Sequence, residues 1–204
     1  MNKVVVFDLG KVLLDFDYWI AATNLAKQSR VDAVAIRGTL FQTSLLVDYE
    51  LGLFDSNEFF TRFRDATGYC GSPDEFGRVF GDIFTPIDKM IALNATLRRA
   101  NVPTYIFSNT NELAVRHISR TFLFFAHFDG YVLSYEERSM KPDVPIYEAV
   151  ERLTQRAGAD IVYIDDRPEN IATGRARGWN TILQQSPEQT REALAPFIPG
   201  HILV

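Results

Sequence analysis

The sequence has a single cysteine and no long hydrophobic run. With only Cys70 among 204 residues, an intrachain disulfide framework and a cysteine-cluster zinc site are both excluded, which fits a reducing compartment. No stretch approaches the length of a membrane span. The N-terminus shows no signal-peptide pattern, because Asp8 interrupts the first apolar run. We therefore expect a soluble, cytoplasmic protein without a membrane partner.

Basic residues are also in deficit. The chain has 26 acidic and 21 basic residues, a formal charge of −5 and an isoelectric point near 5.2, so the basic excess typical of nucleic-acid binders is missing. Neither a GxxxxGK[ST] phosphate loop nor a GxGxxG motif after the first apolar run is present, which leaves nucleotide hydrolysis and dinucleotide binding without motif support. Hydrophobic residues make up 47% of the chain, which is typical of a globular protein.

Four short apolar runs and a weaker fifth predict β-strands. None alternates with polar residues, which is typical of strands covered on both faces of a parallel sheet. Segments with helical spacing lie between them, such as Pro86–Ala100 and Pro145–Arg156. Strands alternating with helices predict an α/β fold with a doubly wound parallel sheet. The runs are Val4–Phe7, Thr104–Phe107, Tyr131–Leu133, Ile161–Ile164 and Thr181–Leu183.

The region between roughly Phe16 and Thr85 interrupts this alternation. It contains helical stretches and no convincing strand. We expect an α/β core domain formed by residues 1–15 and 86–204, and an inserted helical domain at residues 16–85 that packs over the carboxyl edge of the sheet. The predicted helices of the insert are Tyr18–Gln28, Ala33–Thr43, Ser56–Ala66 and Pro73–Phe80.

Polar residues follow four of the predicted strands. Ligands of open α/β sheets bind beyond the carboxyl ends of the strands, so we expect these residues to meet at one edge. They are Asp8, Ser108-Asn109, Lys141 and Asp165-Asp166.

Such a cluster has restricted chemistry. Three neighbouring carboxylates repel one another unless a cation compensates, and an all-oxygen, acidic site suits Mg²⁺. Ser108 and the N–H groups that open the next helix would hold phosphoryl oxygens. Lys141 would neutralise charge on the phosphate and on Asp8. An aspartate in this setting can attack phosphorus and form a covalent aspartyl-phosphate.

The motifs FDLGKV, FSNT, KPD and YIDD, in this order, resemble the four motifs of the haloacid dehalogenase (HAD) superfamily. The resemblance covers Val4 to about Leu183, and the helical insert resembles the C1 cap of that superfamily. The chain is similar in particular to phosphatases of the sugar-phosphate type, which have a similar DLG opening and a cap segment similar to Tyr49-Glu50-Leu51-Gly52. The resemblance implies a Mg²⁺-dependent phosphatase that acts on a small phosphorylated metabolite.

The resemblance also implies roles for single residues in catalysis. Asp8 would be the nucleophile and a metal ligand. Ser108 would bind the transferring phosphoryl group, with a second polar contact from Asn109. Lys141 would bridge Asp8 and the phosphate.

For the metal, the resemblance implies direct ligation of Mg²⁺ by Asp166. Asp165 would be a ligand or would hold a metal-bound water, and Asn170 would orient the water shell. The backbone carbonyl of Gly10 would complete the protein ligands.

Gly10 is also where the sequence departs from the family pattern. The family usually has a second aspartate there, which protonates the leaving group and later activates water. Losing such a group typically costs about 10²–10⁴ in rate. Three outcomes are open. The leaving group could depart without protonation, as in an anomeric sugar phosphate or an acyl phosphate, or Lys11 or a cap residue could replace the missing acid. Otherwise the protein could be slow or inactive. Lys11, where a small residue is usual, could contact the phosphate or lie against the acidic cluster.

Two other functions stay open on the sequence. In metal-free haloacid dehalogenation the same aspartate attacks carbon, but the Asp165-Asp166 pair then has no purpose. A non-catalytic protein that binds a phosphorylated ligand would keep the pocket and lack the acid at Gly10. In that case Gly10→Asp should raise activity if the acid is the only missing part. The oligomeric state and the substrate stay open as well.

Overall fold

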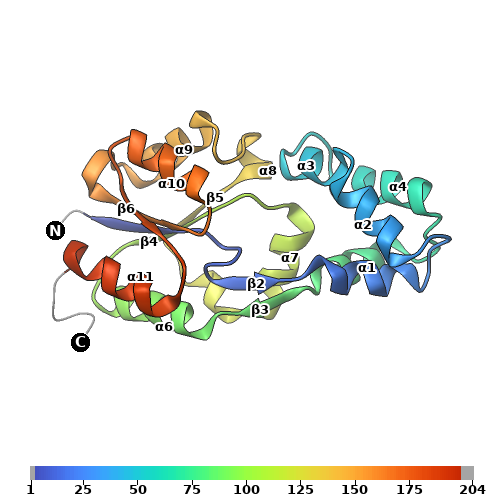
Figure 1. Ribbon diagram of the computed structural model, residues 1–204, viewed down its shortest axis with the longest axis horizontal. Helices are drawn as coiled ribbons and strands as arrows, with labels where there is room; N and C mark the ends of the chain where they lie inside the picture. Colours follow the sequence, from blue (N-terminus) through green and yellow to red (C-terminus); the bar gives the residue numbers. More distant parts are fainter. Residues whose placement is uncertain (1–2, 199–204) are drawn as a thin grey trace.

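The computed structural model describes residues 3–198, and its centre is a parallel five-stranded sheet (Figure 1). The strand order is β5-β4-β1-β6-β7, and each neighbouring pair is parallel. The expected doubly wound α/β fold is therefore confirmed. The strands are β1 (Val4–Phe7), β4 (Thr104–Ser108), β5 (Gly130–Leu133), β6 (Ile161–Asp165) and β7 (Asn180–Leu183).

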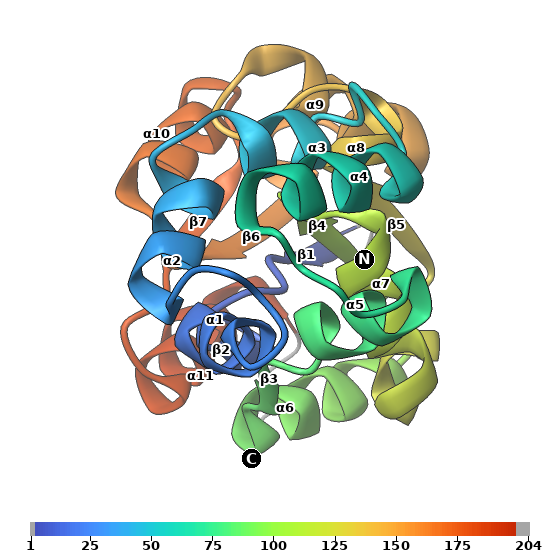
Figure 2. The ribbon, with the colours of Figure 1, turned by 90° about the vertical axis from the view of Figure 1, so that its right-hand side faces the viewer.

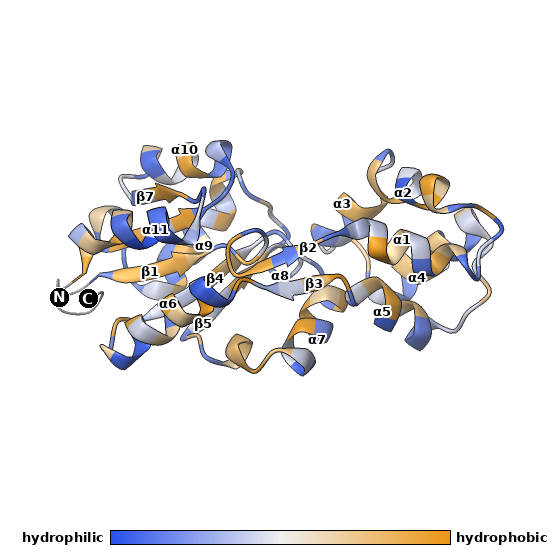
Figure 3. Cartoon of the chain, turned by 60° about the horizontal axis from the view of Figure 1, so that its bottom comes forward, coloured by the Kyte–Doolittle hydropathy of each residue, from blue (hydrophilic) through white to orange (hydrophobic). Residues whose placement is uncertain are grey.

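Helices cover both faces of this sheet, and alternate residues of β1 point to opposite faces. Val5 and Phe7 pack into the cluster that holds α6 (Asp88–Arg99), α7 (Glu112–Thr121) and α11 (Pro187–Leu194). Val4 and Val6 pack against α9 (Val144–Thr154) and α10 (Pro168–Ala176). The strand is coloured as hydrophobic in Figure 3, as expected for a strand buried on both sides. No helix within residues 3–198 combines the length and apolarity needed to cross a bilayer.

Five helices form a second layer beyond the carboxyl ends of the strands; we call them the helical segment. Four of these helices are N-capped by a side chain that accepts a hydrogen bond from an N–H group of the first turn. The capping residues are Asp17, Asp32, Asp55 and Ser72. The helices enclose a separate core rich in aromatic rings, which includes Phe59, Phe76 and Phe80. They are α1 (Tyr18–Ala26), α2 (Ala33–Phe41), α3 (Leu45–Glu50), α4 (Ser56–Thr67) and α5 (Pro73–Gly81).

A two-stranded antiparallel ribbon joins the helical segment to the sheet. Strand β2 (Leu14–Phe16) pairs with β3 (Phe84–Pro86), so the chain leaves and rejoins the core side by side. The prediction that a helix begins at Pro86 is wrong, because Pro86 ends β3 and α6 begins at Asp88. The expected boundaries at 15/16 and 85/86 fall inside this ribbon, and the division into two domains stays a prediction.

Gly52 stands where the helical segment meets the core. Its φ angle is +64°, and a Cβ at this position would lie 2.0 Å from the carbonyl oxygen of Tyr135. Tyr135 belongs to the short helix α8 (Ser134–Glu137), which follows β5. A side chain at residue 52 therefore requires either α3 or α8 to move.

We expect Gly52→Ala to lower the free energy of unfolding by about 3 kcal/mol, because left-handed strain and a backbone clash add together. Gly68→Ala is the matched control: its φ is +66°, but the added Cβ meets only the flexible Arg30 side chain. That variant should lose about 1 kcal/mol. Urea unfolding measures both, and equal losses would contradict the steric contact at Tyr135.

Candidate active site

Of the polar residues expected at one edge of the sheet, all but the fully buried Asp165 line a single cavity. Its volume is about 380 Å³, and it lies between the strand ends and the helical segment. Figure 2 shows the helices α1 to α5 in front of the strands. The structure thus brings together residues from four separated stretches of chain, while the role of each stays a prediction. The cavity is lined by Asp8, Gly10, Lys11, Ser108, Asn109, Lys141, Asp166 and Asn170, among others.

The Lys141 ammonium is a buried cation with three acceptors. Its Nζ lies 2.9 Å from Asp8 Oδ1, 2.7 Å from Asp165 Oδ2 and 3.0 Å from the carbonyl oxygen of Phe107. Burial opposes the charge, but Asp8 and Asp165 more than offset it, so the pKa of Lys141 is raised. The side chain is thus held as a fixed positive charge beside the expected nucleophile.

Asn109 holds the backbone of Lys141. Its Nδ2 donates to the Lys141 carbonyl oxygen at 2.9 Å, and its Oδ1 accepts from the Lys141 N–H at 2.8 Å. Both ends of the amide thus bond to the Lys141 backbone, and the expected contact of Asn109 with the phosphate stays a prediction. Ser108, at the end of β4, is buried beside this pair and lines the cavity.

Asp165 is fully buried and accepts hydrogen bonds on both carboxylate oxygens. The donors are Lys141 Nζ, the Tyr163 hydroxyl, the Arg167 N–H at 2.8 Å and Asn170 Nδ2 at 3.0 and 3.1 Å. Burial alone would raise the pKa of Asp165, but Lys141 and the hydrogen bonds lower it. Asn170 thus holds Asp165 through its Nδ2, and the expected role of Asn170 in orienting the water shell stays a prediction. The hydrogen bond from Tyr163 to Asp165 was not predicted from the sequence, because Tyr163 lies within an otherwise apolar run of β6.

The pKa values of Asp8 and Asp166 are raised, whereas the pKa of Asp165 is lowered. Burial raises the pKa of Asp8 to about 7; Lys141 opposes this rise, and Asp165 and Asp166 add to it. Burial, followed by the charge of Asp165, also raises the pKa of Asp166. Burial thus disfavours the charge of both carboxyl groups and neighbouring carboxylates add to this effect, so a cation would stabilise their ionised forms.

The three aspartates fit a magnesium ion. Asp8, Asp165 and Asp166 each offer one oxygen, and these oxygens lie within 4.8 Å of one another. Ligand oxygens of one Mg²⁺ ion lie about 3–4.2 Å apart, and oxygens that lie within 4.8 Å of one another are compatible with such a site. When ionised, the three carboxylates beside Lys141 leave an excess of two negative charges, which a divalent cation matches. Because the oxygens of Asp165 are already engaged, Asp8 and Asp166 are the better candidates for direct bonds.

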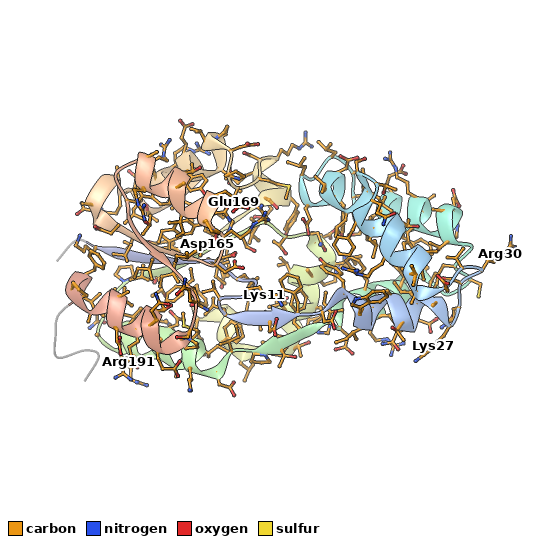
Figure 4. The ribbon with its side chains drawn as sticks, in the orientation of Figure 1. Lys11, Lys27, Arg30, Asp165, Glu169 and Arg191 are labelled. Atoms are coloured by element: carbon orange, nitrogen blue, oxygen red, sulfur yellow. The ribbon has the colours of Figure 1, made fainter. Side chains whose placement is uncertain are left out.

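The Lys11 side chain points away from the cluster of Asp8, Asp165 and Asp166. Its ammonium pairs with Asp15, donates to the Phe16 carbonyl oxygen at 3.1 Å and lies 4.7 Å from the centre of the Phe16 ring. Figure 4 shows Lys11 beside β2, away from the labelled Asp165. The residue lines the cavity, but the structure does not bring its charge to the acidic cluster.

Gly10 has no room for the missing acid. A Cβ at this position would lie 2.8 Å from Cε1 of the Phe16 ring. The expectation that Gly10→Asp raises activity stays a prediction, and it requires the Phe16 ring to move.

The opposite wall of the cavity comes from the helical segment and is mostly apolar. Glu50, at the end of α3, is its one carboxylate. Glu50 belongs to the segment Tyr49-Glu50-Leu51-Gly52, which carries part of the family resemblance, but the sequence predicted no role for its carboxylate. Its apolar neighbours on this wall are Leu40, Phe41, Leu46 and Val47.

We expect Lys141→Met to lower the free energy of unfolding by about 3–5 kcal/mol when no divalent cation is added, because it leaves Asp8 and Asp165 buried without their counter-charge. Lys27→Met is the control, since Lys27 is exposed and its ammonium donates a hydrogen bond to the Asn24 side chain. Chemical unfolding of both variants gives the comparison. A loss for Lys141→Met as small as that of the control would show that the buried ion pairs contribute little.

Three aspartates and a lysine thus lie together at the strand ends of a doubly wound sheet. The model of the haloacid dehalogenase-like hydrolase family matches residues 2–178, and the chain belongs to this family of hydrolases.

Characterised relatives include phosphatases. D-ribitol-5-phosphate phosphatase of Bacteroides thetaiotaomicron is 24% identical over 204 residues, covering 97% of this chain and 99% of its own. A sesquiterpene phosphatase of Aspergillus oryzae is 24% identical over 179 residues, covering 86% of each chain. A HAD family enzyme from Bacteroides thetaiotaomicron, solved with magnesium and inorganic phosphate, has a TM-score of 0.78 at 22% identity; the match covers 90% of this chain and 94% of that one.

Proposed function

We propose that this protein is a Mg²⁺-dependent phosphatase that hydrolyses a small phosphorylated metabolite through an aspartyl-phosphate on Asp8. One observation supports it above all: Asp8, Ser108, Lys141 and Asp166 line the same cavity, with Lys141 bonded to Asp8. The phosphatases among the relatives and the magnesium and phosphate bound to the similar structure support the same chemistry.

In this proposal Asp8 attacks phosphorus, and the alcohol leaves from the opposite side. Lys141 favours the ionised form of Asp8, against the effect of burial, and faces the charge that develops on the phosphoryl oxygens. Ser108 donates its hydroxyl hydrogen to one of these oxygens. Asn109 positions Lys141, because its side chain holds the Lys141 backbone by two hydrogen bonds. A bound Mg²⁺, held by Asp8, Asp166 and the Gly10 carbonyl, with Asp165 as a water-mediated partner, would neutralise charge on the phosphoryl group.

The cavity wall also bears on the substrate. A sugar phosphate would need several hydrogen-bonding groups around its hydroxyls, yet the helical segment contributes mainly aliphatic and aromatic side chains beside Tyr18 and Glu50. This composition favours an alcohol with an apolar carbon skeleton, as named for the sesquiterpene phosphatase, over a polyol such as the ribitol phosphate named for the other relative.

We expect the purified protein to release phosphate from members of a panel of sugar, polyol and isoprenoid monophosphates, and EDTA to abolish this release. Asp8→Asn should lower the rate at least about 10⁴-fold, because the covalent step loses its nucleophile. Asp160→Asn, at an exposed position outside the cavity, is the matched control. Phosphate release by Asp8→Asn at the control rate would contradict the mechanism.

The same panel separates the other two functions. Release of halide from 2-haloacids in the presence of EDTA, without phosphate release, would indicate a metal-free dehalogenase. Tight binding of a phosphorylated ligand with no turnover would indicate a binding protein.

We expect Asp166→Asn to raise the Mg²⁺ concentration needed for half-maximal activity at least about 10-fold, because a neutral amide replaces a charged ligand. The measurement is a Mg²⁺ titration of phosphate release, with Asp160→Asn again as control. An unchanged Mg²⁺ requirement would mean that Asp166 does not ligate the ion.

A further inference from the structure

The proposed reaction lacks a proton donor at residue 10, and the Phe16 ring fills the space where one would stand. The helical segment brings a carboxyl group to the same cavity from the other side. We propose that Glu50 is the general acid and base of this site: it protonates the leaving alcohol and then activates the water that hydrolyses the aspartyl-phosphate. The inference rests on the proposed phosphatase function.

Glu50 is fixed in place by its neighbours along the chain. The Tyr49 hydroxyl accepts a hydrogen bond from the Leu113 N–H at 3.1 Å and pairs with Ser56 Oγ at 2.6 Å. On the other side, Gly52 packs against the Tyr135 carbonyl. Leu113 lies in the first turn of α7, the helix that follows Ser108 and its loop. The end of α3 is therefore anchored to the core beside the residues expected to bind phosphate.

The Asn111 side chain lies next to Glu50 on the core side. Its Oδ1 caps α7 by accepting from the Ala114 N–H at 3.0 Å. Its Nδ2 is buried and has no hydrogen-bond partner at normal distance among residues 3–198, and the amide acts to lower the pKa of Glu50. An unsatisfied buried donor costs free energy. This N–H group is available to a carboxylate at position 50 once the proton has been given away.

The surroundings of Glu50 suit a group that both gives and takes a proton. Burial raises the pKa of its carboxyl to about 7, against the opposing effect of Asn111. A group with a pKa near neutrality can serve as acid in one step and base in the next. The phenol of Tyr18 also faces Glu50, and burial followed by the Glu50 charge raises its pKa well above the usual value. The other ionisable groups around the cavity are Asp8, Lys11, Lys141, Asp166 and Arg167.

Two other candidates are less suitable. Lys11 is paired with Asp15 and bonded to the Phe16 carbonyl, so its proton is already shared away from the reacting centre. Tyr18 holds its proton too tightly to be a good acid near neutrality. Of the carboxyl groups around the cavity, only Glu50 comes from the wall facing the aspartates.

The proton balances over two steps. In the first, a carboxylate oxygen of Asp8 bonds to phosphorus, the phosphorus–oxygen ester bond breaks, and Glu50 gives its proton to the departing alkoxide. In the second, water attacks phosphorus, the bond to Asp8 breaks, and the water proton passes to the Glu50 carboxylate. Inorganic phosphate leaves, and both side chains return to their starting states.

A comparison of leaving groups tests this role. p-Nitrophenolate leaves without protonation, whereas the alkoxide of n-hexyl phosphate needs a proton. We expect Glu50→Gln to lower kcat/KM for n-hexyl phosphate by about 10²–10³ and to change kcat/KM for p-nitrophenyl phosphate by less than about threefold. With the second substrate the variant should also show a burst of one p-nitrophenolate per active site, because hydrolysis of the aspartyl-phosphate has lost its base.

Glu58→Gln is the matched control, since Glu58 is exposed on α4, outside the cavity, and its carboxylate pairs with Arg62. It should behave as the wild-type protein with both substrates. An equal loss on both substrates by Glu50→Gln, without a burst, would show a structural role and overturn the inference. An active wild-type protein whose Glu50→Gln variant is unchanged would overturn the inference alone, whereas a wild-type protein without phosphatase activity would overturn it together with the proposed function.

The pH dependence gives a second readout. Because the acid must be protonated, kcat/KM of the wild-type protein for n-hexyl phosphate should fall as pH rises through about 7, and Glu50→Gln should lack this decline. Independently of activity, a folded-state pKa raised from 4.5 to about 7 stabilises the fold fully below pH 4.5, and this contribution is lost as pH rises to about 7. The unfolding free energy of the wild-type protein should therefore fall relative to Glu50→Gln over that range, and parallel curves would overturn the inference.

Discussion

The site is organised around one buried ammonium group. Lys141 is almost fully enclosed, and its three hydrogen bonds join a carboxylate at the end of β1, a carboxylate at the end of β6 and a carbonyl in β4. Burying any one of these charges alone would be costly, and together they satisfy one another. The three central strands are thereby tied at the edge where the cavity opens. Asn109 and Asn170 extend the same network by holding Lys141 and Asp165.

The two walls of the cavity differ in chemistry. The core side concentrates charge: aspartates and a lysine held by strands and by hydrogen bonds, which suits binding and activating a phosphoryl group. The side formed by the helical segment is apolar apart from Glu50 and the Tyr18 hydroxyl, and it suits an organic group and a proton held at a raised pKa. Position 10 thus has no acid, the Phe16 ring lies where its side chain would be, and the opposite wall of the cavity carries the Glu50 carboxyl group.

The sequence was sufficient for the sheet because its strands are short, apolar on both faces and followed by polar residues. All five strands were placed to within one residue at either end, and the aspartates, Ser108 and Lys141 followed from them. The rest depends on contacts between distant segments. The strands β2 and β3 have three residues each and are stabilised by each other, and the six-residue helix α3 lacks a side-chain cap. Contacts between distant segments also decide three features of the site that no local sequence pattern predicts. These are the direction of the Lys11 ammonium, the two hydrogen bonds of the Asn109 amide and the raised pKa of Glu50.

The ribbon of β2 and β3 has a consequence for how the chain folds. Strand β1 pairs with β4 and β6, which lie far away in sequence, and parallel pairing over such separations is slow because a long loop must close first. Once Leu14 meets Pro86, the whole helical segment is bypassed, and the loop left between β1 and β4 is much shorter. The entropic cost of closing the loop between β2 and β3 grows only with the logarithm of its length, so residues added to the helical segment raise this cost by little. The helical segment, with its own aromatic core, can therefore vary in length and sequence while the ribbon keeps it joined to the sheet that carries the aspartates.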